Sequence, residues 1–312
     1  MAAFMAGLVQ LAKHRRKPKP EWLKVRMPGG GRYENVRRTL RELNLTTVCE
    51  EASCPNMGEC WGSGTATVML MGEVCTRGCR FCDVASGTPG PLDPLEPRHL
   101  AEAVGRLGLD YLVVTSVNRD ELSDGGAAHF AQAIVELRRT APKTLVEVLT
   151  PDFQGSREAL QMIIDAAPTV AAHNLETVER LTPRVRDRRA TYRQSLEVLK
   201  FYKAGGMRTK SSLMLGLGET RDEVLQAMRD LRAVDCDILT LGQYLRPSEK
   251  HLAVEEFVRP EVFKELEQEG LSLGFKFVAA GPLVRSSYKA GEFFVKNWIG
   301  DPAAEHSAAV GC

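Results

Sequence analysis

The strongest indication of the fold is an alternation of short apolar runs with longer amphipathic segments, which begins near residue 65. Strand-like apolar runs occur six times, at 66–71, 111–115, 145–149, 169–172, 211–215 and 238–241. A helix-like pattern follows each of them, at 97–106, 126–138, 156–166, 191–203, 220–233 and 260–271. Six βα units with continuously apolar strands predict a parallel sheet that is covered by helices.

The number of units decides which α/β architecture is expected. A complete eightfold barrel would need two more units, so we expect an open, partial (βα)6 barrel, with a doubly wound sheet as the alternative. A further run at 275–279 is expected to add an edge strand. The chain then divides into an N-terminal extension (1–64), which holds a short amphipathic helix at 34–43, a core (65–283) and a C-terminal extension (284–312).

Composition excludes several classes of protein. The 312 residues include 41 Lys and Arg against 40 Asp and Glu, a net charge of +1, which argues against a protein that coats nucleic acid or an anionic membrane. No apolar run approaches the ~18 residues that a membrane-spanning helix needs. Residues 1–20 carry five basic residues and no acid; a solvated terminus is favoured over a transit peptide. We expect a soluble cytoplasmic protein, with a mitochondrial or plastid address as the alternative.

The cysteines are strongly clustered. Six of the eight lie within 34 residues, and the full set is Cys49, Cys54, Cys60, Cys75, Cys79, Cys82, Cys236 and Cys312. Disulfide scaffolds are mostly short secreted chains, and this long chain shows no export signal. The cluster therefore predicts metal binding. Cys236 is interpreted as a small core residue and Cys312 as a terminal thiol.

The second trio along the chain has the spacing Cys75-x3-Cys79-x2-Cys82. Structural zinc normally takes four ligands, whereas three thiolates on one tight loop suit a cubane iron–sulfur cluster whose fourth iron stays open. With Phe81 before the last cysteine, this segment resembles the radical S-adenosylmethionine enzymes. That resemblance implies that the open iron chelates S-adenosylmethionine and that reductive cleavage yields a 5′-deoxyadenosyl radical. It also implies the partial TIM-type barrel of that superfamily.

The first trio, Cys49-x4-Cys54-x5-Cys60, is another set of three soft ligands, which favours iron–sulfur or zinc. Zinc completed by a distant histidine is the alternative. Two adjacent trios resemble the lipoyl synthase family, and the resemblance runs from about residue 20 to about residue 295. Further matching segments are Gly125-Gly126, His173-Asn174-Leu175-Glu176, Gly216-Leu217-Gly218-Glu219-Thr220 and Arg285-Ser286-Ser287-Tyr288.

The resemblance implies a second, auxiliary [4Fe–4S] cluster that is held by the first trio and by Ser287. It implies a sulfurtransferase of lipoate biosynthesis and protein lipoylation. Such an enzyme inserts two sulfur atoms at the sixth and eighth carbons of a protein-bound octanoyl-lysine. The auxiliary cluster is the sulfur source, and two S-adenosylmethionine molecules are used per product. The catalytic set is then Cys75, Cys79, Cys82 and Ser287.

The expected contacts with S-adenosylmethionine lie at the carboxyl ends of the predicted strands, where barrels of this type gather their reactive groups. They are Asn118, Asn174, Glu176, Arg186, Gly216 and Gly218. A solvated charge run is the ordinary interpretation of the segment that contains Arg186.

The expected partners also follow from the resemblance. They are an octanoylated lipoyl carrier domain or glycine-cleavage H protein, a reduced ferredoxin or flavodoxin, and an iron–sulfur carrier that rebuilds the auxiliary cluster. We expect a monomer with no nucleic-acid or membrane partner. Two rival functions are a biotin-synthase-like radical enzyme, which would lack the Ser287 ligand, and a non-catalytic cysteine-rich metal protein.

Overall fold

The computed structural model describes residues 18–25, 29–51, 54–63 and 65–287. Its centre is one eight-stranded sheet in which the order of strands in space follows their order in the chain. The strands are β1 (Thr46–Thr47), β2 (Thr65–Leu70), β5 (Tyr111–Ser116), β6 (Leu145–Leu149), β7 (Val170–Ala172), β8 (Thr209–Leu215), β9 (Ile238–Gln243) and β10 (Phe277–Gly281). All neighbouring pairs from β2 to β10 are parallel, and only β1 runs antiparallel to its neighbour.

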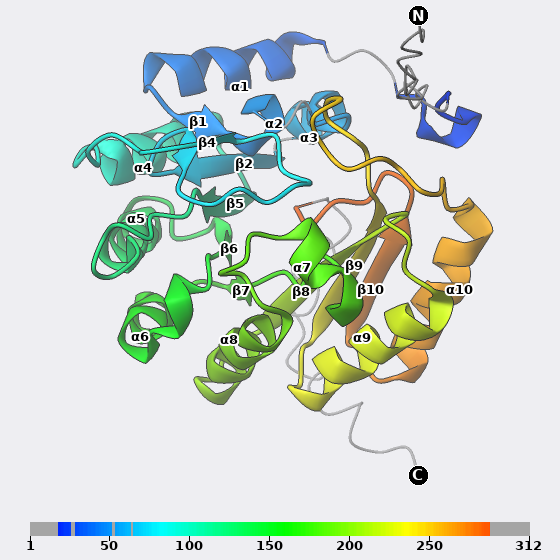
Figure 1. Cartoon of the computed structure of the whole chain (residues 1–312). Coiled ribbons are helices and arrows are strands. Elements are labelled where there is room, and N and C mark those ends of the chain that lie inside the picture. Colours follow the sequence, from blue (N-terminus) through cyan, green and yellow to red (C-terminus); the bar gives the residue numbers. More distant parts are fainter. Residues whose placement is uncertain (1–17, 26–28, 52–53, 64, 288–312) are drawn as a thin grey trace, which may run out of the picture.

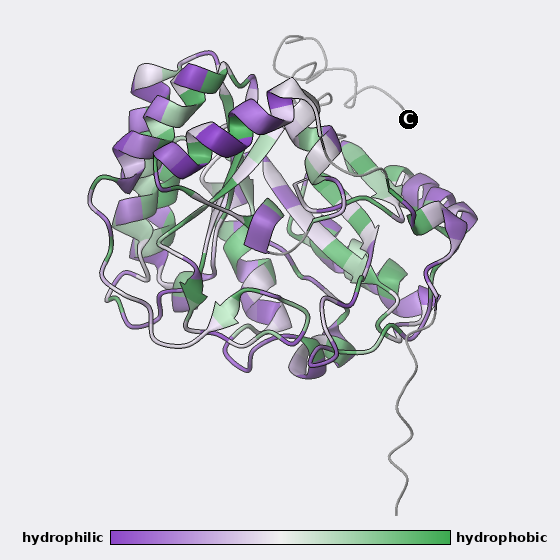
Figure 2. Cartoon of the chain, turned by 90° about the horizontal axis from the view of Figure 1, so that it is seen from above, coloured by the Kyte–Doolittle hydropathy of each residue, from purple (hydrophilic) through white to green (hydrophobic). Residues whose placement is uncertain are grey.

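A helix follows each of the strands β2, β5, β6, β7, β8 and β9. These helices are α4 (Glu96–Leu107), α5 (Ala127–Thr140), α6 (Arg157–Ala166), α8 (Tyr192–Ala204), α9 (Arg221–Ala233) and α10 (Pro260–Ser272). They form an arc outside the strands (Figure 1), and helices with mixed hydrophilic and hydrophobic residues are visible in Figure 2. The six predicted βα units are confirmed.

The sheet is an open, partial barrel, because its outer strands β1 and β10 do not pair with each other in the described part of the chain. The doubly wound alternative is wrong, since it requires a reversal of strand order that the sheet does not show. The expected edge strand at 275–279 is β10, displaced to 277–281 because Phe275 packs into the core before the strand begins. The chain boundaries at 64/65 and 283/284 stay a prediction.

Helix starts are fixed by side chains that satisfy free backbone N–H groups. Ser156 accepts from the N–H of Ala159, and Thr191 accepts from the N–H of Gln194. Thr220 and Glu223 form a reciprocal capping box at α9. Because the caps fix where these helices begin, they also position the loops that connect each helix to the preceding strand. The site is built from these loops.

The N-terminal part packs beside β2. The expected helix at 34–43 is α1 (Gly31–Glu42), and the short helices α2 (Val48–Glu51) and α3 (Met57–Ser63) carry cysteines of the first trio. Tyr33 of α1 stacks on Trp61 of α3 with ring centroids 5.1 Å apart. The remaining short elements are η1 (Glu21–Leu23), β3 (Val74–Cys75), β4 (Ala85–Ser86), η2 (Phe153–Gly155), η3 (Glu179–Leu181) and α7 (Thr182–Val185). Among the described residues, none of the helices combines the length and the apolar character of a membrane span.

The amino-terminal half of the barrel interior is filled. Lys210 donates to both carboxylate oxygens of Glu147 at 2.7 and 2.8 Å, and the Tyr111 hydroxyl donates to the same carboxylate at 2.6 Å. All three side chains are buried, so the ion pair is fully hydrogen-bonded and carries no unpaired charge. Open space therefore lies at the opposite end, where the strands finish.

Candidate active site

A cavity of about 630 Å³ lies at the carboxyl ends of the parallel strands. Its wall includes residues that end or follow β5, β6, β7, β8 and β9, together with the Cys75–Cys82 loop. This is the edge of the sheet at which sequence analysis expected the reactive groups. Active sites of α/β barrels occupy the same edge because the strand-to-helix loops converge there.

Both cysteine trios reach this cavity. It is lined by Cys49, Cys54, Cys75, Cys79, Cys82 and Ser287. The sixth cysteine of the two trios, Cys60 on α3, is buried in the same hydrophobic core as Cys49. No disulfide joins the described cysteines.

The Cys75–Cys82 loop fits an iron–sulfur cluster. The backbone N–H groups of Arg77 and Asn118 donate to the Cys75 sulfur at 3.4 and 3.3 Å, and that of Asp187 donates to the Cys79 sulfur at 3.3 Å. Hydrogen bonds of this kind stabilise the thiolate charge of a ligated sulfur. Among the described residues, no group of three His, Cys, Asp or Glu is close enough to hold a single metal ion.

Burial governs the ionisation of these thiols. It raises the pKa of Cys82 to about 12 and also raises the pKa of Cys79, and the neighbouring thiols of the trio raise both further. On the other trio, burial and then the nearby Cys54 raise the pKa of Cys49 to about 12. Such thiols stay protonated near neutral pH unless a cation replaces the proton.

The segment that leads to Ser287 runs from β10 back to the first trio. Its Leu283 carbonyl accepts a hydrogen bond from Asn56 Nδ2 at 2.5 Å. Arg285 donates to the Gln243 carbonyl at 3.2 Å and lies near Cys54, while burial lowers its pKa. Gly242 permits this path, because a Cβ there would lie 2.1 Å from the Val284 carbonyl oxygen.

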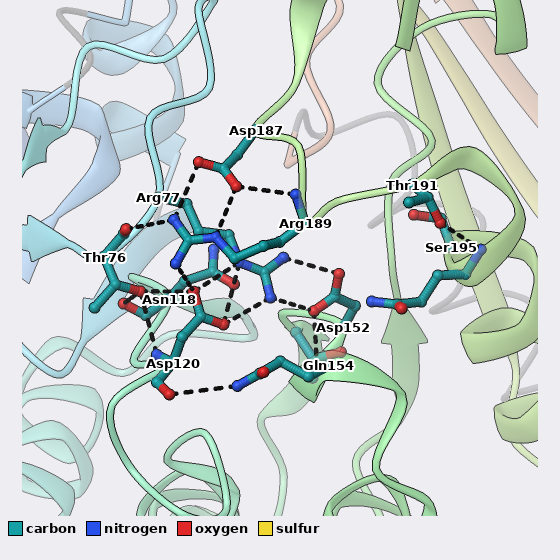
Figure 3. A network of polar contacts seen from close by, with 12 residues as sticks. Thr76, Arg77, Asn118, Asp120, Asp152, Gln154, Asp187, Arg189, Thr191 and Ser195 are labelled. Atoms are coloured by element: carbon teal, nitrogen blue, oxygen red, sulfur yellow. Dashed lines mark hydrogen bonds and ion pairs between the residues drawn. The ribbon is translucent and has the colours of Figure 1, made fainter. Parts of the chain in front are cut away.

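Arg77, which sequence analysis did not select, is the buried centre of a polar network (Figure 3). It donates from Nε and Nη2 to Asp120, after β5, at 2.7–3.2 Å, and from Nη1 and Nη2 to Asp152, after β6, at 2.8 and 2.7 Å. These bonds hold the pKa of both carboxyls below its usual range, against the effect of burial. The sequence indicated this network only by an acidic residue after each of two strands, Asp120 after β5 and Asp152 after β6.

Arg186 is buried, although it lies in a run of charges that would ordinarily be solvated. Its Nη1 donates to the Ser195 hydroxyl at 2.7 Å, while its buried Nε has no hydrogen-bond partner among the described residues. His173 lies on the other side of Ser195, 3.0 Å from its hydroxyl, and its Nδ1 lies 2.9 Å from the Thr150 carbonyl. Because burial and then Arg186 lower the pKa of His173 to about 4, the ring is neutral at pH 7.

The other predicted cofactor contacts divide into two groups. Asn118, Asn174 and Glu176 line the cavity with Arg186. Asn174 Nδ2 donates to Glu176 at 3.0 Å, and burial raises the pKa of Glu176 while Arg186 opposes that change. The cavity therefore brings four of the six together.

Gly216 and Gly218 are not among the residues that line the cavity. Gly216 has φ +96°, and a Cβ there would lie 2.3 Å from both Gln243 Nε2 and the Glu256 carbonyl oxygen. Glu219 accepts from the N–H of Gly216 at 2.5 Å. Close packing accounts for the glycine at 216, and a contact of this turn with S-adenosylmethionine stays a prediction.

Known structures share the fold at low sequence identity. A methylornithine synthase matches with a TM-score of 0.53 and 13% identity, over 79% of this chain and 81% of its own. A maturase of the [FeFe]-hydrogenase matches with a TM-score of 0.53 and 14% identity, over 80% of this chain and 69% of its own. These similarities concern the fold alone.

Sequence comparisons are far more specific. The Radical SAM superfamily model matches residues 69–231, and the model of the N-terminal domain of lipoyl synthase matches residues 2–54. A lipoyl synthase of Myxococcus xanthus is 61% identical over 89% of this chain and 94% of its own. One from an Anaeromyxobacter species is 63% identical over 89% and 95%, and a mitochondrial one of Branchiostoma floridae is 55% identical over 92% and 78%. By these matches the chain belongs to the lipoyl synthase family of radical S-adenosylmethionine enzymes.

Proposed function

We propose that this lipoyl synthase works with two [4Fe–4S] clusters in one cavity. Membership in the superfamily implies one cluster and S-adenosylmethionine, and the relatives imply an octanoylated substrate protein. Our assignment gives the first cluster to Cys75, Cys79 and Cys82. It gives the auxiliary cluster to Cys49, Cys54, Cys60 and Ser287.

One observation carries this assignment: Ser287 meets all of the second trio and two cysteines of the first, Cys49 and Cys54, at the same cavity, although more than 200 residues separate Ser287 from either trio. A serine oxygen is a harder ligand than a thiolate and matches iron in a sulfide cluster less well. A weak fourth ligand suits a cluster that must be opened. The biotin-synthase-like alternative has no role for this serine.

When bound, the clusters and S-adenosylmethionine would supply the adenosyl radical and the sulfur for insertion at the sixth and eighth carbons of the octanoyl chain. The chain's own task is positioning and exclusion of water. The filled barrel below the cavity prevents entry from the amino-terminal side. Apolar wall residues such as Leu149, Phe81 and Met214 fit an alkyl chain.

We also propose the residues that hold S-adenosylmethionine. The unpartnered Nε of Arg186 would donate to its carboxylate, because a buried donor without a partner is costly until a ligand satisfies it. Asn174 and Glu176 would bond its ribose or its methionine moiety. Asn118, which follows β5, would provide a further contact with S-adenosylmethionine. The Gly216–Gly218 turn would approach the adenosine through its backbone.

The remaining assignments rest on the family. The substrate protein would be a lipoyl carrier domain or a glycine-cleavage H protein, and a ferredoxin or flavodoxin would supply electrons. An iron–sulfur carrier would rebuild the auxiliary cluster, and the enzyme would act as a cytoplasmic monomer. The extensions 1–64 and 284–312 would then carry the auxiliary site and 65–283 the radical chemistry.

Iron and sulfide content per chain tests the two-cluster assignment. After anaerobic reconstitution we expect about eight iron atoms in the native chain, and about four in both Cys54→Ala and Cys79→Ala. A native chain that binds only four would contradict the proposal. So would a variant that keeps all eight.

A further inference from the structure

The polar network around Arg77 also fixes backbone N–H groups that contact the cysteine sulfurs. Three backbone N–H groups donate to sulfurs of the Cys75–Cys82 loop, and they belong to Arg77, Asn118 and Asp187. Each of these residues is fixed by the same set of charged side chains (Figure 3). The set comprises Arg77, Asp120, Asp152, Asp187 and Arg189, and we call it the charged brace.

The first donor is fixed by its own side chain. The guanidinium of Arg77 bonds both Asp120 and Asp152, and these carboxylates follow two different strands. A bidentate fork of this kind fixes the orientation of the arginine as well as its position. The Arg77 N–H is thereby held toward the Cys75 sulfur at 3.4 Å.

The second donor is fixed through Thr76. The Asn118 carbonyl accepts from the Thr76 N–H at 3.0 Å, and Asp120 accepts from the Thr76 hydroxyl at 2.8 Å. Because Asp120 also bonds Arg77 and Arg189, the brace ties the loop to the segment 118–120. The N–H of Asn118 then lies 3.3 Å from the Cys75 sulfur.

The third donor is fixed from the other wall of the cavity. The Asp187 carboxylate accepts from the Gly78 N–H at 3.0 Å and from Arg189 Nε at 2.8 Å. Arg189 also donates to the Thr76 carbonyl at 2.7 Å. The Asp187 N–H is thereby directed at the Cys79 sulfur at 3.3 Å.

Hydrogen bonds to cluster sulfurs stabilise the more negative, reduced state, so they raise the reduction potential. We propose that the charged brace sets the reduction potential of the S-adenosylmethionine-binding cluster by aiming three backbone N–H groups at Cys75 and Cys79. Arg77 and Arg189 are its positioning residues. This inference rests on the proposed assignment of Cys75, Cys79 and Cys82 as ligands.

A charge-conserving substitution distinguishes the effect of N–H orientation on the reduction potential from the effect of nearby charge. Arg77→Lys keeps the positive charge but loses the fork, so the N–H groups are held less firmly while the net charge near the cluster is unchanged. The full-length chain with Cys54→Ala provides the background, in which about four iron atoms per chain confirm a single cluster. The readout is the midpoint potential, measured by redox titration followed by visible absorbance.

We expect Arg77→Lys to lower the ratio of reduced to oxidised cluster several-fold at a fixed applied potential, where a tenfold change corresponds to 59 mV for one electron. Arg189→Lys, at a more exposed side chain, should lower it in the same direction by a smaller factor. It supplies the test if Arg77→Lys does not fold. The matched control is Arg80→Lys in the same loop, whose guanidinium has no hydrogen bond or ion pair among the described residues.

The outcomes are distinct. A lower potential in Arg77→Lys or Arg189→Lys, with Arg80→Lys unchanged, supports the brace. A loss of thermal stability with an unchanged potential would reduce the brace to a structural role and overturn the proposal. A Cys54→Ala chain that binds no cluster would instead refute the ligand assignment, and this inference with it.

Discussion

The two cysteine trios share one cavity but are held by different forces. The Cys75–Cys82 loop is fixed by ion pairs of the buried Arg77 with loops after two strands, and by a hydrogen bond from the Gly78 N–H to Asp187. The first trio is held mainly by apolar packing, since Cys49, Cys60 and Trp61 belong to the hydrophobic core and α3 stacks on α1, and the Cys49 thiol adds hydrogen bonds with Thr67. Directional bonds fix orientation, whereas apolar packing fixes volume.

This difference matches the two proposed tasks. A cluster that cleaves S-adenosylmethionine repeatedly needs ligands in one orientation. A cluster consumed as a sulfur source must be opened and rebuilt, which non-directional packing permits more readily. Four experiments test whether the two trios differ in this way.

The largest effect is expected from removing one ligand of each trio. Cys79→Ala should abolish reductive cleavage of S-adenosylmethionine, because the open cluster loses a ligand. Cys54→Ala should retain cleavage and give no thiolated product, because only the sulfur source is lost. Both are measured by chromatography of 5′-deoxyadenosine and mass spectrometry of the octanoylated protein. Equal loss of cleavage in both variants would contradict the proposal that one cluster cleaves S-adenosylmethionine and the other supplies sulfur.

Ser287→Ala should lower sulfur insertion at least a hundredfold while cleavage persists, because the auxiliary cluster loses its fourth ligand. The neighbouring Ser286→Ala is the matched control and should form product at a near-native rate. Product formation by Ser287→Ala close to that of the control would show that Ser287 is not a ligand.

Arg186→Gln should weaken S-adenosylmethionine binding about tenfold to a hundredfold, the usual range for one buried charged hydrogen bond. Equilibrium binding to the reconstituted protein measures this. The exposed Arg188→Gln in the same charged run should bind as the native chain does. If both variants bind alike, the carboxylate contact lies elsewhere.

The smallest expected effect is a difference between the two regions in how the free energy of unfolding depends on pH. The folded-state pKa of Asp152 is depressed, so its stabilisation is fully present above the unfolded pKa of about 3.9 and is lost as pH falls through the lower folded value. Asp152→Asn should therefore cost about 3–5 kcal/mol at pH 7 and less at pH 3.

Trp61→Phe, in the apolar region, should lower stability by an amount that does not change between pH 7 and pH 3. Urea denaturation of the cluster-free proteins measures the free energy of unfolding at each pH. A deficit for Asp152→Asn that stays constant with pH would contradict the ionic account of the first loop.

Much of the fold could be predicted from the sequence, because parallel strands buried on both faces are continuously apolar. All six predicted strands correspond to β2, β5, β6, β7, β8 and β9. The helices α2 and α3 were not predicted, since seven residues or fewer around cysteine and glycine show no helical period. The two-residue strands β3 and β4 are too short for any pattern.

Only the part of the site that lies in recognisable sequence motifs was predicted. Cysteine spacing and resemblance identified the proposed ligands, including Ser287, which no local pattern distinguishes from a surface turn. The brace was missed because its bonds join residues far apart in the chain, 75 positions between Arg77 and Asp152 and 108 between Cys79 and Asp187. A charged residue is expected in solvent until a distant partner is known.

Isotopically labelled sulfide tests the division of tasks between the two trios most directly. The chain is reconstituted with labelled sulfide, excess sulfide is removed, and one turnover on an octanoylated carrier protein is analysed by mass spectrometry. We predict label at both the sixth and eighth carbons in the native chain and no thiolated product in Cys54→Ala. Product sulfur without label would contradict the claim that the cluster on the first trio is the sulfur source.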